Sequence, residues 1–185
     1  LMTGLGAPED TRLGTDFSGL VEAVGKDVTK FKVGDEVFGG GGGAFAQYMT
    51  VREDRGIALK PANVSFQQAG TVAITGVTAI QALRDLGKIE RGQKVLINGA
   101  SGGVGTLAVQ IAKSFGAEVT GVSSAKNHAM VRSLGADKMI DYKTEDYTDS
   151  TLKYDLIIDM VGNHSLLSNR QVMTEQGRLV IVGGS

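Results

Sequence analysis

The stretch that most constrains the fold is residues 94–116, which read KVLINGASGGVGTLAVQIAKSFG. It begins with a short apolar run, passes through a glycine-rich turn and continues with apolar residues at helical spacing. Gly116 stands where glycine commonly follows the end of a helix. The pattern therefore predicts a strand, a tight turn and a helix, the order that binds a dinucleotide in open α/β sheets.

The turn itself, ASGGVG, matches the pattern G-x-G-x-x-G with alanine in the first position. We expect Ala100 to let the chain turn off the strand, Gly102 to let the backbone approach a pyrophosphate, and Gly105 to let the helix pack closely on the sheet. The start of the helix adds unpaired N–H groups and a partial positive charge. A loop that only reverses the chain is the alternative, which the flanking strand and helix disfavour. The predicted pyrophosphate-binding residues are Ala100, Ser101, Gly102, Gly103, Val104 and Gly105.

The chain before this stretch has a different character. Residues 1–74 carry short β-like runs cut by turns, and they end in a capping-box signal, Ser65 with Gln68, that predicts a helix. We expect a second helix at 78–86 after a break near Thr75 and Gly76. The strands predicted in this part are 17–24, 32–38 and 44–51, with a flexible loop of five glycines at 39–43.

From residue 94 onward the pattern alternates between strand and helix. Such alternation predicts a doubly wound parallel sheet with right-handed crossovers, the Rossmann type of α/β fold, with strand order 3-2-1-4-5. Its ligand crevice lies at the carboxyl ends of strands 1 and 4. We place the domain boundary near Ile74, which gives a β domain at 1–74 and a dinucleotide-binding domain at 75–185. The further strands are expected at 118–123, 138–142, 154–161 and 178–182, and the helices at 126–134 and 164–176.

The end of the second strand indicates which dinucleotide is bound. An acidic residue there would hold the ribose 2′-hydroxyl of NAD, but the chain has Ser123 and Ser124, followed by Lys126. Hydroxyl donors and a lysine suit a 2′-phosphate, so we predict NADPH rather than NADH. Tyr142 lies along the same edge and is expected to contact the 2′-phosphate or the adenosine. The alternatives are an ordinary exposed lysine and a partly buried tyrosine at a strand end.

Charge and composition exclude several other functions. The formal net charge of −1, from 19 basic and 20 acidic residues, gives no basic footprint for nucleic acid. Because there is no cysteine, disulfides and thiolate zinc sites are excluded. No apolar run has membrane-spanning length and no signal peptide is visible, which predicts a soluble cytoplasmic protein. His128 and His164 are expected at the surface, and no acid, base or nucleophile can be named, since the cofactor carries the chemistry of hydride transfer.

Eight segments, taken together, resemble the zinc-independent, zeta-crystallin-like quinone oxidoreductase branch of the medium-chain dehydrogenase/reductase superfamily. The resemblance implies a GroES-like β domain, here partial, joined to a Rossmann domain. It also implies NADPH-dependent reduction of a small-molecule substrate, either a quinone or an activated carbon–carbon double bond of an enone or enal. The segments are LGTDFSGLVEAVG (13–25), FKVGDEVFG (31–39), GAFAQYMTV (43–51), TGVTAIQAL (75–83), LINGASGGVGTLAVQIAKSFGAEV (96–119), RSLGAD (132–137), YDLIIDMVG (154–162) and GRLVIVGG (177–184).

The resemblance also assigns residues. Ser123 and Lys126 match the 2′-phosphate positions, and Tyr142 matches a tyrosine on the adenosine side. Thr15 and Asp16 stand where zinc-using relatives carry His-Glu, so no metal site is expected. The residues expected beside the nicotinamide are Thr78, Val161, Val182, Gly183 and Gly184.

Relatives in this branch are longer than 185 residues. We therefore expect the chain to be truncated at both ends, without the last strand of the sheet and the C-terminal segment, and with an open sheet edge through which a homodimer would form. The alternatives to an enzyme are an NADPH-binding module without turnover and a structural role like that of lens crystallins.

Overall fold

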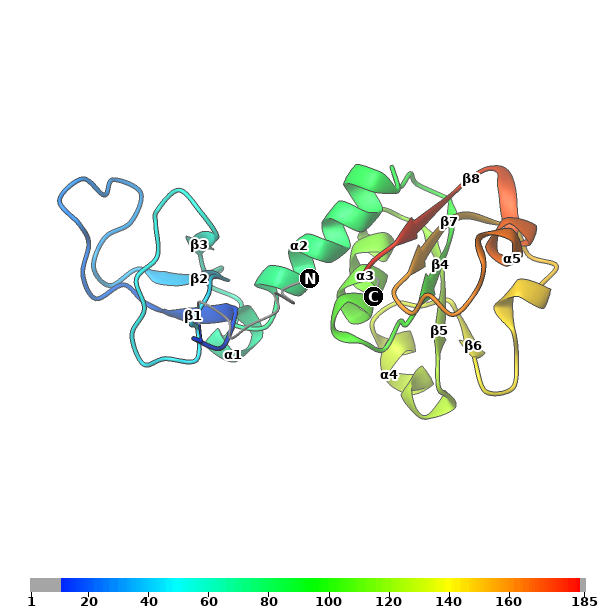
Figure 1. Cartoon of the computed structure of the whole chain (residues 1–185), viewed down its shortest axis with the longest axis horizontal. Helices are drawn as coiled ribbons and strands as arrows, with labels where there is room; N and C mark the ends of the chain where they lie inside the picture. The colour runs from blue at the N-terminus through cyan, green and yellow to red at the C-terminus, as the bar shows by residue number, and fades with distance from the viewer. Residues whose placement is uncertain (1–10, 184–185) are drawn as a thin grey trace. The chain divides into compact units, whose positions relative to one another are not determined.

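The computed structural model describes residues 11–183, and the chain divides between Ile74 and Thr75 into two compact units (Figure 1). The first unit contains a three-stranded antiparallel sheet in the order β1-β2-β3. Its strands are β1 (Asp16–Leu20), β2 (Glu36–Gly40) and β3 (Ile57–Leu59), and they are followed by the short helix α1 (Phe66–Ala69). The predicted capping box is confirmed, since Gln68 N donates to Ser65 Oγ at 3.2 Å and Ser65 N donates to Gln68 Oε1 at 3.0 Å.

Two predictions for this unit are wrong. Residues 44–51 form no strand. They pair with a neighbouring segment at their start, where Ala44 N donates to Gly14 O at 3.2 Å and Phe45 N donates to Leu13 O at 2.9 Å, and Phe45 is 81% exposed. An alternating pattern with no buried face has nothing to fix its register. The five glycines are also not one loop, because Gly39 and Gly40 belong to β2, where a side chain on Gly39 would overlap the carbonyl oxygen of Gly56.

The second unit is built on a parallel five-stranded sheet in the order β6-β5-β4-β7-β8. This order confirms the predicted 3-2-1-4-5 arrangement and the Rossmann-type fold. Val95 of the central strand pairs with Val119 on one side and Leu156 on the other. The strands are β4 (Lys94–Asn98), β5 (Glu118–Ser123), β6 (Lys138–Asp141), β7 (Tyr154–Asp159) and β8 (Met173–Ile181).

The helices differ from prediction at two places. There is no break at Thr75 and Gly76, because α2 (Ala73–Ile80) runs through them and continues directly into a π-helical turn, η1 (Gln81–Leu86). The helix expected at 164–176 is only α5 (Leu166–Gln171), since Met173 already pairs with Tyr154 and the chain enters β8. The remaining helical segments are α3 (Gly103–Ser114), η2 (Ala125–Asn127), α4 (His128–Ser133) and η3 (Tyr147–Asp149).

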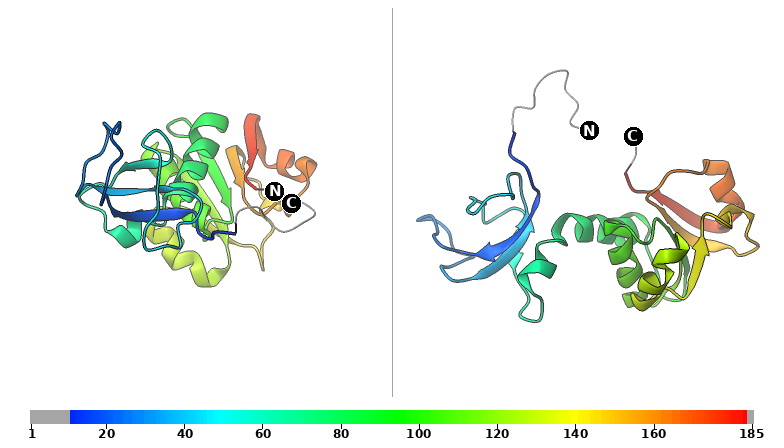
Figure 2. Two further views of the ribbon diagram at one scale, coloured as in Figure 1. Left: turned by 60° about the vertical axis from the view of Figure 1, so that its left-hand side comes forward. Right: turned by 90° about the horizontal axis from the view of Figure 1, so that it is seen from below.

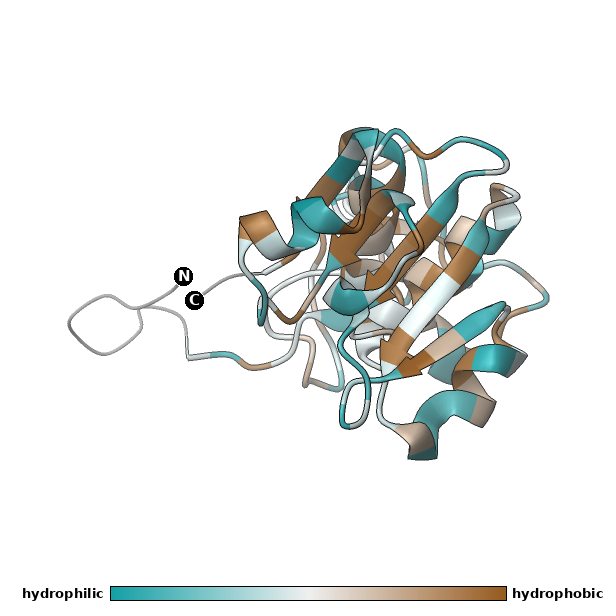
Figure 3. Ribbon diagram, turned by 90° about the vertical axis from the view of Figure 1, so that its right-hand side faces the viewer, coloured by the Kyte–Doolittle hydropathy of each residue, from teal (hydrophilic) through white to brown (hydrophobic). Residues whose placement is uncertain are grey.

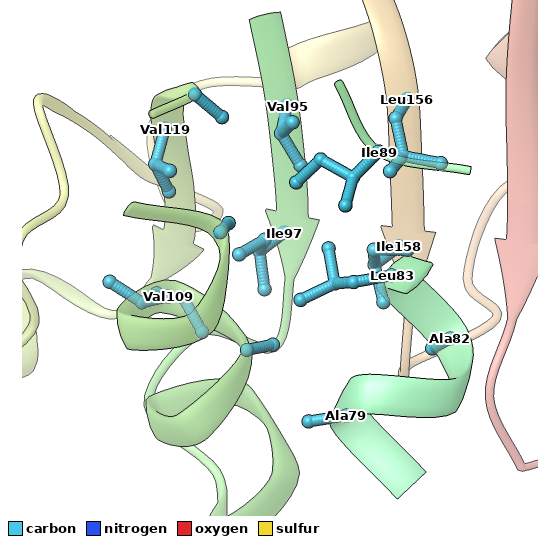
Figure 4. Packing of buried hydrophobic residues seen from close by; sticks show 14 of the residues in the cluster. Ala79, Ala82, Leu83, Ile89, Val95, Ile97, Val109, Val119, Leu156 and Ile158 are labelled. Atoms are coloured by element: carbon cyan, nitrogen blue, oxygen red, sulfur yellow. The ribbon is translucent and has the colours of Figure 1, made fainter. Parts of the chain in front are cut away.

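Two apolar clusters cover the two faces of this sheet. The larger joins α2, η1 and α3 to the strands, with Leu83, Val109 and Ile97 among its fully buried members (Figure 4). The smaller lies on the other face, where Tyr147 of η3 and Val172 after α5 pack on Leu96. Figures 1 and 2 show α3 and α5 on opposite sides of the sheet. Hydrophobic colour in Figure 3 concentrates along the strands and the inner helix surfaces, as burial on both faces requires.

No helix within residues 11–183 combines the length and the apolar character needed to cross a membrane.

Candidate functional site

Two cavities open at the carboxyl ends of the strands in the second unit. The loop cavity, of ≈ 540 Å³, lies over the glycine-rich turn, and the edge cavity, of ≈ 320 Å³, lies beside the ends of β4, β5 and β6. The loop cavity is lined by Thr78, Gly99, Ser101, Gly102, Gly103, Val104, Gly105, Met160, Val182 and Gly183. The edge cavity is lined by Asn98, Val122, residues 142–147, Asn163 and His164.

The chain turns off β4 at Gly99, one residue earlier than predicted. Gly99 has φ 89°, a left-handed conformation that favours glycine, and it lines the loop cavity. Its N–H and that of Ala100 both donate to Val122 O, at 3.2 and 3.0 Å. The methyl group of Ala100 is buried against Gly121, where an added Cβ would lie 3.1 Å from it. Ala100 therefore packs under the turn and neither makes it nor offers an N–H to a ligand.

Two glycines of the motif are required for different reasons. A Cβ on Gly105 would overlap the carbonyl oxygen of Gly99 and lie 2.8 Å from the Cα of Ala100, so the helix can approach the turn only without a side chain there. A Cβ on Gly102 would meet only Gly99 O, at 3.4 Å, which is an ordinary contact. The space beside Gly102 is thus open toward the loop cavity, as a backbone that receives a pyrophosphate requires.

The same turn presents unpaired hydrogen-bond donors. Gly102 N donates to Gly99 O at 3.0 Å, and the first helical bond runs from Thr106 N to Gly102 O at 2.9 Å. Among the described residues, no partner takes the N–H groups of Ser101 and of the first three residues of α3, Gly103 to Gly105. Four such N–H groups lie at the positive end of a twelve-residue helix, an arrangement that favours a bound anion.

The segment after β5 is tied to this turn by a residue that sequence reasoning missed. Asn127 Nδ2 donates to Ser101 Oγ at 3.1 Å and to Ser124 Oγ at 3.4 Å. Ser123 and Ser124 are buried, and Ser123 Oγ donates to Ser124 O at 3.3 Å. Lys126 is exposed between them and α4. The only sequence signal was an amide residue four positions past the end of β5, which is too common to single out.

His128 was predicted at the surface, and the structure leaves it partly exposed. Its ring is partly buried, and Nε2 lies 3.2 Å from Ser123 O. This contact holds the histidine at the start of α4 against the last residue of β5.

A buried carboxylate shapes the loop after β7. Asp159 is 1% exposed, and its Oδ1 accepts from Asn98 Nδ2 at 2.9 Å, Val161 N at 3.0 Å and Gly162 N at 2.9 Å. Asn98 also donates to Asn163 Oδ1 at 2.9 Å. This network fixes the backbone between the two cavities. An aspartate directly after the apolar run Leu156 to Ile158 was the available sequence signal for it.

The wall of the edge cavity contains an aromatic pair. Tyr147 and His164 meet edge-on with ring centroids 4.6 Å apart, and Tyr147 Oη donates to Asn169 Oδ1 at 2.9 Å. Burial, with a smaller contribution from the nearby Asp159 charge, raises the pKa of Tyr147 well above its usual value. His164 Nε2 lies 3.6 Å from Asp146 Oδ1, and its side chain, predicted at the surface, is 17% exposed. Asp146 Oδ1 also accepts from Thr148 N at 2.8 Å.

The predicted site residues therefore fall into three groups. Most line the loop cavity, Tyr142 lines the edge cavity, and Ala100, Ser123, Lys126 and Val161 line neither. Gly184 lies outside the described residues. No cluster of three or more His, Cys, Asp or Glu side chains that could hold a metal ion occurs within residues 11–183. The predicted residues in the loop cavity are Thr78, Ser101, Gly102, Gly103, Val104, Gly105, Val182 and Gly183.

Comparison with known protein families agrees with the two units. Residues 2–62 match the alcohol dehydrogenase GroES-like domain, and residues 103–185 match the family described as zinc-binding dehydrogenase. The first match covers the antiparallel sheet, and the second begins at the first residue of α3. Together they support an N-terminal GroES-like domain followed by a Rossmann-type domain.

Individual relatives are reductases. The chain is 32% identical over 179 residues to the quinone oxidoreductase of Homo sapiens, covering 92% of this chain and 54% of that protein. It is 36% identical over 191 residues to the 2-methylene-furan-3-one reductase of Solanum lycopersicum, covering 97% and 48%. The solved quinone oxidoreductase of Coxiella burnetii superposes with a TM-score of 0.82 at 36% identity, covering 90% and 54%. The chain thus spans about half the length of these relatives.

Proposed function

Because the chain belongs to the medium-chain dehydrogenase/reductase superfamily and is quinone-oxidoreductase-like, we propose that it is an NADPH-dependent oxidoreductase that reduces quinones or activated carbon–carbon double bonds. The superfamily implies a nicotinamide cofactor, and the choice between NADPH and NADH is part of the proposal. The observation that carries it is the turn at Gly102. There an open backbone position and four unpaired N–H groups face one cavity.

Each of the two cavities would hold a different part of a dinucleotide. The loop cavity would take the pyrophosphate against Ser101 to Gly105 and the nicotinamide half against Thr78, Val182 and Gly183. The edge cavity, with the exposed ring of Tyr142 at its wall, would take the adenosine half. The end of β4 lies between the two cavities, with Asn98 lining one and Gly99 lining the other. One extended ligand can therefore reach over the end of β4 and occupy both cavities.

The preference for NADPH rests on charge at the end of β5. No carboxylate stands at Ser123 or Ser124, and Lys126 is exposed beside them. Asp141, at the end of the neighbouring strand β6, accepts from Lys143 N at 3.1 Å within its own turn. A 2′-phosphate would therefore meet the exposed Lys126 and no carboxylate of β5 at this edge, while the ribose hydroxyl of NADH would find no acidic acceptor at Ser123 or Ser124.

The protein's part in the reaction is positioning. When bound, a reduced nicotinamide supplies a hydride, and a proton from solvent completes the two-electron reduction of the substrate. Thr78, Val182 and Gly183 would hold the ring, and the Asp159 network would hold the loop beside it. We also propose zinc-independent chemistry, a cytoplasmic location and a homodimer formed through the outer edge of β8, which pairs only with β7 among the described strands.

Cofactor binding can be tested by thermal denaturation of the chain with NADPH and, separately, with NADH. A ligand that binds only the folded state stabilises it by about 2.7 kcal/mol at one hundred times its dissociation constant. For a chain of this size that is roughly a 5–10 °C rise in melting temperature. We expect this rise with NADPH and a clearly smaller one with NADH at the same concentration. Cooperative melting that neither cofactor shifts would refute the proposal.

Turnover is a separate question from binding. NADPH oxidation, followed by absorbance, should require an added acceptor such as 1,4-benzoquinone or 2-cyclohexenone. Acceptor-dependent oxidation that is faster with NADPH than with NADH supports the proposed enzyme. Tight NADPH binding without any acceptor-dependent oxidation would instead leave a cofactor-binding module and contradict the catalytic part of the proposal.

A further inference from the structure

We propose that Asn127 is a positioning residue that sets the preference of this site for a 2′-phosphate. It would act by orienting the hydroxyl groups of Ser101 and Ser124 as hydrogen-bond donors toward phosphate oxygens. This inference rests on the proposed function, because it concerns how the same site tells NADPH from NADH. Asn127 lies outside the dinucleotide motif and lines neither cavity.

The first observation is what the Asn127 side chain does not do. Asn127 directly precedes α4 as the last residue of η2, and its backbone is already helical, with φ −99° and ψ −5°. Its side chain makes no capping bond to the first turn of α4. Its amide group is turned instead toward Ser101 Oγ and Ser124 Oγ, at 3.1 and 3.4 Å. The residue therefore serves the two serines and not the helix.

The second observation is what this amide does to the two hydroxyl groups. A serine hydroxyl has one hydrogen to donate and two lone pairs that accept. Because Asn127 Nδ2 donates to both oxygens, it occupies a lone pair on each and leaves both hydroxyl hydrogens for another acceptor. Neither Ser101 nor Ser124 donates its hydroxyl to any partner in the described part of the chain. Phosphate oxygens only accept, so both serines are prepared for them.

The third observation is the position of the two serines. Ser101 lies on the pyrophosphate turn and lines the loop cavity. Ser124, which is 6% exposed and lines neither cavity, directly follows β5, where the 2′ substituent of the adenosine ribose is expected. A single amide thus joins the two places where NADPH carries phosphate. NADH carries phosphate only at the first. Loss of the Ser101 contact should weaken both cofactors, whereas loss of the Ser124 contact should weaken NADPH alone.

The isosteric variant Asn127→Asp provides the sharpest test. A carboxylate has the same shape but only accepts, so it would draw both serine hydrogens toward itself and place a negative charge between the phosphates. We expect dissociation constants from fluorescence titration to rise by at least about tenfold more for NADPH than for NADH. Asn127→Ala removes the two bonds without adding charge, and about a threefold fall in the NADPH preference is expected.

The matched control is Gln176→Glu, the same amide-to-carboxylate change at an exposed residue of β8. It should leave the ratio of the two dissociation constants unchanged. Titration with 2′,5′-ADP and 5′-ADP repeats the comparison without the nicotinamide, and only 2′,5′-ADP should lose affinity strongly in Asn127→Asp.

The outcomes are separable. If wild-type protein binds neither cofactor, the proposed function fails and this inference fails with it. If wild type prefers NADPH and Asn127→Asp weakens NADPH and NADH equally, or changes neither, the proposed function stands and the role of Asn127 is refuted. If Asn127→Asp does not fold, Asn127→Ala decides, and an unchanged NADPH preference in that variant would also refute the role.

Discussion

The sharpest prediction concerns Gly105 and Gly102 of the motif. Gly105 is needed for the packing of α3 on the turn, whereas Gly102 is proposed to leave space for the cofactor. In Gly105→Ala, the new methyl group would overlap the carbonyl oxygen of Gly99 and crowd the backbone of Ala100. All of these atoms are main chain in the turn that directly follows the central strand β4, and the clash is relieved only if α3 shifts away from that turn. In Gly102→Ala, the methyl group would have one ordinary contact, 3.4 Å from Gly99 O.

The magnitudes follow from these contacts. Overpacking against rigid backbone costs about 3 kcal/mol or more, partly offset by the ~1 kcal/mol gain of alanine over glycine inside a helix. We therefore expect Gly105→Ala to lower the free energy of unfolding by at least about 2 kcal/mol, a large share of a typical total of about 5–15 kcal/mol. At Gly102, the N-cap of α3, alanine is a poorer cap than glycine, which lowers the free energy of unfolding by roughly 0.5–1 kcal/mol. Alanine also restricts the unfolded chain, which raises the free energy of unfolding by a similar amount.

Urea denaturation followed by circular dichroism measures both variants without cofactor. Gly105→Ala should show a clearly lower midpoint, and Gly102→Ala should stay within about 0.5 kcal/mol of wild type. With NADPH added, wild type should gain stability and Gly102→Ala should not, since its methyl group occupies the space beside the pyrophosphate. Equal stability of the two variants, or a Gly102→Ala protein that binds NADPH normally, would refute the assignment of roles.

Two further predictions concern buried polar groups. Asp159→Ala removes the acceptor of three hydrogen bonds and leaves Asn98 with a lost partner, so we expect the free energy of unfolding to fall by about 2–4 kcal/mol in urea denaturation, and a loss below about 1 kcal/mol would contradict the network's role. Tyr147→Phe should cost about 1 kcal/mol at neutral pH, because Asn169 Oδ1 loses its donor. Burial raises the pKa of Tyr147 in the folded state, so its contribution is present in full below about pH 10, where the unfolded tyrosine titrates, and is lost as the pH rises further. The stability difference between wild type and Tyr147→Phe should therefore shrink above about pH 10, and a difference that stays constant to pH 11 would disprove this.

The strand order of the sheet could be predicted because each βαβ unit carries its own local signals. Apolar runs such as Val95 to Ile97 are buried on both faces when they lie inside a sheet that helices cover on each side. Because the crossovers between parallel strands have a fixed hand, the strand order then follows. Local rules failed where a segment's state depends on a distant partner. Residues 44–51 alternate like a strand but belong to no sheet. Residues 173–176 suit a helix but lie in β8 instead, where Met173 pairs with Tyr154 of β7.

The glycine-rich turn could be predicted from the sequence because tight turns and close backbone approaches favour glycine. Even so, the conformationally demanding residue is Gly99, not the first residue of the matched pattern, since a spacing rule does not report φ angles. Asn127 and Asp159 could not be assigned in advance. Their roles depend on which serine, asparagine or loop N–H lies beside them across the strand ends, and that information exists only after the sheet has formed.

The central place of β4 also affects how a growing chain can assemble. β4 is the first strand of its sheet to be made, yet its two neighbours are β5, which starts at Glu118, and β7, which starts at Tyr154. During synthesis one edge of β4 can be paired as soon as α3 and β5 are complete. The other edge, with unpaired backbone groups next to Val95 and Ile97, must wait until Asp159 has left the ribosome. β4, the central strand of the finished sheet, thus keeps one edge unpaired until β7 has been made.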